Sequence, residues 1–203
     1  MKRVKVLRSL VAAVMALGLV ATLPGIAAAS SRVGGSPAGG SARTSAGSTI
    51  ASVANRYVGY GACGLGGSGF VSPSGSYSCA AGNPIAGWCD EFAGFVWAKS
   101  GVVKTSGLGT GPGGFVTYAG GDPLSQTPHV GDVAVMSPPN TSTNSHVAIV
   151  TAVSGTSVTM VGGNEGGGQG VVARSYYTAG NYQRTPTDGY HYHVRGYVAP
   201  KLK

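Results

Sequence analysis

The chain has 203 residues, of which 10% are charged and 36 are glycine. Fourteen Lys and Arg residues against six Asp and Glu residues give a formal net charge of +8 at pH 7. Four of the basic residues lie within the first eight positions, so the rest of the chain carries +4, and residues 49–203 carry +2. This weak and scattered charge excludes the basic surface that is expected of a nucleic-acid-binding protein.

The first 29 residues have the pattern of a secretory signal peptide. A basic start is followed by an apolar stretch from about Leu10 to Leu23 and then by Ala27, Ala28 and Ala29. No basic stop-transfer cluster follows, so we expect cleavage after Ala29. The apolar stretch approaches the length that spans a membrane, and an uncleaved membrane anchor is therefore the alternative.

Residues 30–48 are predicted to be a flexible linker. The segment SSRVGGSPAGGSARTSAGS is rich in Gly and Ser, lacks aromatic side chains and has almost no apolar ones. Such a segment buries too little surface to offset the entropy lost when a chain becomes ordered. The remaining residues, 49–203, are enough for one domain with a single core.

Helices are expected in the first half of this domain. Residues 49–57 place apolar side chains on one helix face and are followed by Gly59 and Gly61. A second helix is predicted from Trp88 to about Ser100, ending at Gly101 as its C-cap glycine. Between residues 102 and 130 we expect loops, with one helical turn near residues 115–118.

The second half changes to short runs rich in Val, Tyr and Thr, which predict strands. The connection Ser154-Gly155-Thr156 is tight, so the strands on either side of it should pair as antiparallel neighbours. Asp132 lies in the turn before the first run, where its carboxylate should cap local N–H groups. Helices followed by a strand meander indicate an α+β fold with N-terminal helices packed on an antiparallel sheet. The predicted strands are 131–136, 146–153, 157–163, 170–177 and 192–198.

Cys89 is the candidate nucleophile. It opens the segment CDEFAGFVWAKS, in which apolar residues recur with the period of one helix face. A sulfur on the first turn of a helix faces unpaired backbone N–H groups and the positive end of the helix dipole. Both favour the thiolate, which is the form that attacks carbonyl groups.

His146 and Asn164 are candidates for the groups that would assist this thiol. His146 opens the apolar run HVAIVTAV, and Asn164 closes the run VTMVGGN, so a base and an orienting amide are expected on neighbouring strands. The three residue types together are typical of a cysteine hydrolase.

Several blocks of the sequence resemble the CHAP family, the cysteine- and histidine-dependent amidohydrolases and peptidases of the papain-like NlpC-type clan. The resemblance extends over most of residues 49–203 and rests on IASVANRYVG, GWCDEFAGFVWAKSGV, HVGDVAVM, SHVAIVTAV and VTMVGGNEG. It implies a papain-like α+β fold, with Cys89 as nucleophile and His146 as general base and then general acid.

The third residue departs from the family pattern. In many members a Glu that lies two residues before an Asn orients the imidazole, and here that position is Gly162. We therefore assign the orienting role to Asn164, in a Cys-His-Asn arrangement. Glu165 is the alternative, although a regular strand would turn its side chain toward the opposite face.

The three cysteines of the chain leave one thiol unpaired in an exported protein. Cys63 and Cys79 flank a loop rich in Gly and Ser, and a disulfide between them would contribute about 3 kcal/mol. We favour this pairing, which leaves Cys89 free. The alternative, a disulfide between Cys79 and Cys89, would consume the proposed nucleophile.

The resemblance implies hydrolysis of an amide bond in bacterial peptidoglycan, with no metal or other cofactor. We expect a monomer that is secreted, is extracellular or associated with the cell wall, binds no nucleic acid and has no stable membrane association after signal cleavage. A mild positive charge suits an anionic wall. Two alternatives remain: a non-catalytic wall-binding or structural exoprotein with this fold, and a related secreted protease that acts on proteins.

Overall fold

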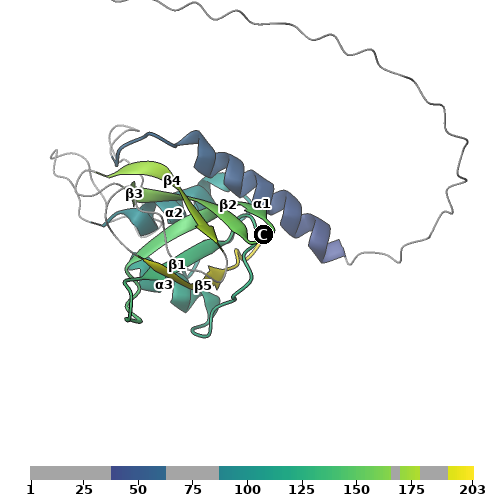
Figure 1. Ribbon diagram of the computed structural model, residues 1–203. Coiled ribbons are helices and arrows are strands. Elements are labelled where there is room, and N and C mark those ends of the chain that lie inside the picture. Colours follow the sequence, from purple (N-terminus) through teal and green to yellow (C-terminus); the bar gives the residue numbers. More distant parts are fainter. Residues whose placement is uncertain (1–37, 63–86, 166–169, 179–191) are drawn as a thin grey trace, which may run out of the picture. The chain divides into compact units, whose positions relative to one another are not determined.

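The computed structural model describes residues 38–62, 87–165, 170–178 and 192–203, all within one compact unit, Ser36–Lys203 (Figure 1). The signal peptide predicted for residues 1–29 lies outside the described residues and stays a prediction. The helices within these ranges are α1 (Ala38–Arg56), α2 (Cys89–Ser100) and α3 (Gly111–Ala119). The strands are β1 (Val133–Ser137), β2 (His146–Ser154), β3 (Ser157–Glu165), β4 (Val171–Thr178) and β5 (His193–Val198).

The strands form one antiparallel sheet in the order β4-β3-β2-β1-β5. The predicted tight connection is confirmed, because Ser154 pairs with Ser157 and Gly155 between them has a φ of 56°. His146 pairs with Met136, which places the start of β2 beside the end of β1. The functional residues described below lie at this end of the sheet.

All three helices pack on one face of the sheet (Figure 1). Their buried side chains form one cluster with alternate residues of the strands, including Phe92 of α2, Phe115 of α3 and Ile149 of β2. The other alternate residues form a second cluster on the opposite face, around Met136 and Met160. The predicted α+β fold is therefore confirmed. None of the helices among the described residues has both the length and the apolar character to span a membrane.

Helix α1 corrects the predicted linker. Its first eleven residues, 38–48, belong to the segment that was expected to be flexible, while residues 30–37 lie outside the described part of the chain. Small residues let this helix approach its neighbours closely: Ala46 is buried, and a Cβ on Gly47 would overlap the backbone of Val130. The prediction counted apolar area alone and took no account of close contact through small residues.

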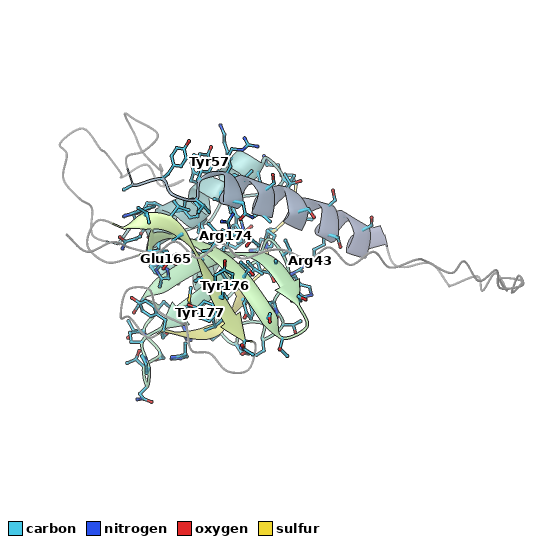
Figure 2. The ribbon with its side chains drawn as sticks, turned by 45° about the horizontal axis from the view of Figure 1, so that its top comes forward. Arg43, Tyr57, Glu165, Arg174, Tyr176 and Tyr177 are labelled. Atoms are coloured by element: carbon cyan, nitrogen blue, oxygen red, sulfur yellow. The ribbon has the colours of Figure 1, made fainter. Side chains whose placement is uncertain are left out.

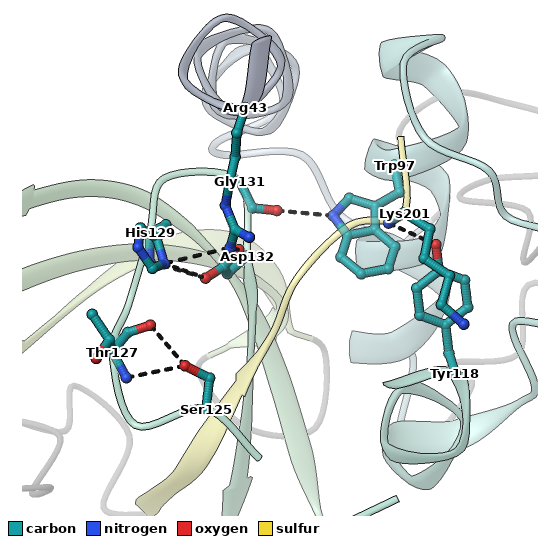
Figure 3. Close-up of polar contacts among 9 residues, drawn as sticks. All are labelled: Arg43, Trp97, Tyr118, Ser125, Thr127, His129, Gly131, Asp132 and Lys201. Carbon is teal, nitrogen blue, oxygen red and sulfur yellow. Dashed lines mark hydrogen bonds and ion pairs between the residues drawn. The ribbon is translucent and has the colours of Figure 1, made fainter. Parts of the chain in front are cut away.

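An ion pair at the start of α1 fixes this helix to the turn before β1 (Figure 3). Arg43 donates to Oδ1 of buried Asp132 at 2.9 Å, and the backbone N–H of His129 donates to Oδ2 at 3.0 Å. The predicted capping role of Asp132 is thus confirmed. Trp97 of α2 donates to the carbonyl of Gly131 in the same turn at 3.0 Å. The turn therefore joins α1, α2 and the sheet.

Arg43 and the proposed catalytic end of the sheet are far apart. Asp132, which binds Arg43, precedes the start of β1, whereas His146 lies beside the end of β1. Figure 2 shows the same separation, with Arg43 and Glu165 labelled at opposite sides of the sheet.

Arg174 of β4 donates to Oδ1 of Asn55 at 2.9 and 3.1 Å and so connects the edge of the sheet to the C-terminal part of α1.

Candidate active site

Cys89 is the first residue of α2, which begins one residue after its predicted start, so the thiol lies on the first helical turn as the sequence predicts. Its side chain is buried, with 2% of its surface exposed, and it is a free thiol. The preceding residue, Trp88, has φ −102° and ψ 24° and provides no side-chain cap to the helix. The start of α2 is also the place where negative charge on the sulfur or on a bound carbonyl would be stabilised.

His146 is the first residue of β2 and is also buried. Its Nε2 lies 3.0 Å from Oε1 of Glu165, and the imidazole also interacts with the side chain of Cys89. The ring of Tyr192 stacks on the imidazole, with centroids 5.4 Å apart and planes 12° from parallel. The imidazole is therefore held between a thiol and a carboxylate and covered by an aromatic ring.

The surroundings of His146 strongly favour its protonated form. Burial alone lowers the pKa of this imidazole, because a charged ring loses its hydration. The charge and hydrogen bond of Cys89 and then the hydrogen bond and charge of Glu165 act in the opposite direction, and the pKa rises from 6.5 to about 10. An imidazolium has two N–H donors, one for the sulfur of Cys89 and one for the carboxylate of Glu165. The imidazolium is thus the form of His146 that its surroundings favour at neutral pH.

The structure corrects the third residue of the site. The sequence analysis assigns the contact with His146 to Asn164, but the carboxylate of Glu165 makes it. Among the described residues Asn164 has no hydrogen bond to the imidazole, and its side chain is half-buried. Glu165, with 2% of its surface exposed, was the alternative that strand alternation argued against.

A β-bulge in β3 explains the change of face. Gly162 pairs with Ala173 of β4, but Glu165 pairs with Val171, so three steps along β3 match two steps along β4. One extra residue reverses the alternation of the residues that follow it. Asn164 has a φ of 55°, a left-handed conformation that Asn adopts more readily than most residues. Glu165 therefore returns to the face on which the sequence pattern placed Asn164.

Two neighbouring carboxyl groups, those of Asp90 and Glu91, follow Cys89 on the first turn of α2. Burial, followed by the hydrogen bond and charge of Asp90, raises the pKa of Glu91 to about 8. Oδ2 of Asp90 accepts a hydrogen bond from the backbone N–H of Gly111 at 2.6 Å, which connects α2 to the start of α3. Two adjacent acidic residues were the sequence signal for this pair, although the pattern does not predict the shared proton.

The predicted disulfide lies outside the described residues. Cys63 and Cys79 are both in the range 63–86, so their pairing stays a prediction. No group of three or more His, Cys, Asp or Glu residues suited to a metal ion occurs within the described ranges.

A model of the CHAP domain family matches residues 75–164. The matched range includes Cys89 and His146 and ends one residue before Glu165. The chain contains a CHAP domain. Three helices on a five-stranded antiparallel sheet are consistent with this family, and CHAP domains are in general hydrolases of the amidase or peptidase type. Searches of curated proteins and of solved structures found no significant match.

Within this CHAP domain the predicted thiol and imidazole come together, whereas the predicted amide does not take part. The family resemblance places the orienting carboxylate at position 162, which is a glycine in this chain. The carboxylate that contacts His146 comes instead from Glu165, three residues later. Cys89, His146 and Glu165 therefore form the candidate active site.

Proposed function

We propose that the chain is a secreted cysteine amidohydrolase or endopeptidase that cleaves an amide bond of bacterial peptidoglycan. The observation that carries the proposal is the buried arrangement of Cys89, His146 and Glu165 at the start of α2 and the adjoining strand ends. Thiol, imidazole and carboxylate are the groups needed for nucleophilic attack on an acyl carbon at neutral pH. The CHAP domain supports the amide as the bond that is cleaved.

The reaction would begin with attack of the Cys89 thiolate on the amide carbonyl. A carbon–sulfur bond forms, and the π electrons of the carbonyl move onto its oxygen. The backbone N–H of Cys89, at the start of α2, is the donor that we propose for this oxyanion. When the intermediate collapses, the carbon–nitrogen bond breaks and the His146 imidazolium gives its proton to the leaving amine.

Deacylation uses the same groups in the opposite sense. The now neutral imidazole of His146 takes a proton from water, and the resulting hydroxide attacks the thioester carbon. The carbon–sulfur bond breaks, which releases a carboxylic acid and restores the thiolate. Glu165 keeps the imidazole oriented and stabilises its positive charge in both steps.

Two features support a catalytic protein over a non-catalytic wall-binding protein. The lack of a Glu at position 162 would favour a non-catalytic protein, but Glu165 supplies a carboxylate at 3.0 Å from His146. The raised pKa of His146, at about 10, is the second feature, because perturbed titration in a buried pair is typical of catalytic sites. The secreted location, the monomeric state and peptidoglycan as partner are parts of the same proposal.

Digestion of purified peptidoglycan tests the proposal. The protein and its Cys89→Ala variant are incubated with walls of several cross-bridge chemistries, and the released fragments are identified by mass spectrometry. We expect new amine termini with the unmodified protein alone, and the fragment masses name the bond. If neither protein releases fragments with new amine termini from any of the walls, hydrolysis of peptidoglycan is contradicted. Cleavage of a protein-derived peptide library in that case would favour the protease alternative.

A further inference from the structure

We propose that Gly162, Gly163 and Asn164 act together as a positioning device that presents the Glu165 carboxylate to His146. The proposal rests on the proposed function, because it assigns residues that support its site without touching substrate. We call these three residues the β3 cradle. Each of them has a separate geometric role, and none of the roles follows from the apolar pattern of the strand.

Gly162 leaves the space that the carboxylate occupies. A Cβ on Gly162 would overlap Oε1 of Glu165, would lie 3.2 Å from its Cδ and would be 3.3 Å from Cβ of Ala148. The space beside the Cα of Gly162 is thus filled by the carboxylate oxygen that contacts His146. Any larger residue at position 162 would displace Glu165 or force the strand to move.

Gly163 faces the opposite side of β3 and fixes the distance to α2. A Cβ there would lie 2.6 Å from Cβ of Phe92 and 2.6 Å from the ring of Trp88. Trp88 precedes Cys89 and Phe92 follows it by three positions, so the cradle contacts the first turn of α2, which carries the thiol. The backbone of β3 can approach α2 this closely only because position 163 has no side chain.

Asn164 supplies the conformation that turns Glu165 to the correct face. Its φ of 55° provides the extra residue of the bulge, and Gly170 packs on it so closely that a Cβ on Gly170 would be 2.6 Å from Cα of Asn164. In a regular strand, Glu165 would project toward the helices instead. Asn164 therefore acts on His146 through the backbone and through Glu165.

The chain contains a matched control for the backbone effect. Gly155, in the β2–β3 turn, has a φ of 56°, nearly that of Asn164, and a Cβ there would have no atom within 4 Å. Asn164→Val and Gly155→Val thus place the same β-branched side chain in the same strained conformation at opposite ends of one hairpin. A merely structural role predicts similar consequences for the two variants.

Two readouts separate this proposal from the proposed function. The first is the pKa of the His146 imidazole, measured by NMR titration of its ring nitrogens. The second is the rate at which iodoacetamide alkylates the Cys89 peptide as a function of pH, followed by mass spectrometry. Neither needs peptidoglycan, so both remain informative if no wall is cleaved.

We expect Gly162→Ala and Asn164→Val to lower the pKa of His146 and to shift the alkylation profile with it. Where wall hydrolysis is measured, we expect kcat to fall about 100-fold, the cost of a displacement of about 1 Å in a preorganised site. Asn164→Gly, which keeps the left-handed conformation without strain, should retain the pKa of His146.

Gly155→Val should lower thermal stability without changing either readout. The proposal is overturned if Gly162→Ala and Asn164→Val leave the His146 pKa and the alkylation profile like those of Gly155→Val while folding is retained, as judged by circular dichroism. It is also overturned if Asn164→Gly disturbs the imidazole as much as Asn164→Val, because the conformation would then not be what matters.

Discussion

Oε1 of Glu165 lies 3.0 Å from Nε2 of His146, and both side chains are buried at the end of the sheet where α2 begins. A buried carboxylate beside an imidazole orients the ring and stabilises its positive charge. Because Glu165 favours the protonated imidazole, His146 can act as the proton donor beside Cys89.

Removing the charge of Glu165 should impair catalysis far more than removing the side chain of Asn164. Glu165→Gln keeps the size of the side chain but removes the charge, so the pKa of His146 should fall and kcat should drop by about 100-fold or more. Asn164→Gly leaves the carboxylate in place and should cost less than threefold. Steady-state kinetics on soluble peptidoglycan fragments measures both values. Equal losses in the two variants would contradict the assignment of Glu165.

Removing the thiol should lower the pKa of the imidazole. Cys89 is the largest of the influences that raise the pKa of His146, whereas burial lowers it. In Cys89→Ala the burial remains and the negative partner is lost, so the pKa should fall well below about 10. NMR titration of the ring detects the change. A pKa that stays near its value in the unmodified protein would mean that Cys89 and His146 do not interact.

Glu91 should make the folded state less stable as the pH rises. Its pKa is about 8 in the folded protein against 4.5 for the free side chain, so the folded state binds more protons than the unfolded state between these values. The stability gained from the shared proton is therefore complete at low pH and is lost as the pH rises from about 4.5 to about 8. Glu91→Gln should flatten this part of the curve, measured by urea unfolding at a series of pH values. An unchanged slope in Glu91→Gln would refute the prediction.

The first turns of α1 should contribute measurable stability through Arg43. Arg43→Ala leaves the buried carboxylate of Asp132 without its ion pair, but the Arg43 side chain is 40% exposed and partly screened by water. We expect a loss of about 1 to 2 kcal/mol in the free energy of unfolding. Thr44→Ala, which removes a hydroxyl that donates to the carbonyl of Gly40 in the same helix, is the control. No difference between the two variants would mean that α1 docks without help from the ion pair.

The elements with regular periodicity were predictable from the sequence. Helix α2 begins within one residue of its predicted start, and each of the five predicted strand segments contains a strand. Helix α1 was predicted from residue 49 but begins at Ala38, because its first turns depend on the Arg43 ion pair and on close packing of small residues. Such contacts involve residues far apart in the sequence, and local composition does not record them.

The candidate site was predictable in two of its three residues. The helix start at Cys89 and the strand start at His146 follow from periodicity, and the structure brings their side chains together. Glu165 was assigned the lesser role because a regular strand alternates its faces. The sequence did contain a signal for the bulge, since Gly162 and Gly163 precede an Asn within a strand, and glycine in a strand often marks a bulge or a close approach.

The central claim, that Cys89 attacks an amide carbonyl and forms an acyl-enzyme, is tested most directly by mass spectrometry of the protein itself. The chain is mixed with soluble peptidoglycan fragments, quenched with acid after short times and digested for peptide mapping. The proposed mechanism predicts an adduct on the Cys89 peptide with the mass of the acyl half of the cleaved bond, formed before the free product accumulates. Product release without any adduct, at an equal rate in Cys89→Ala, would contradict it.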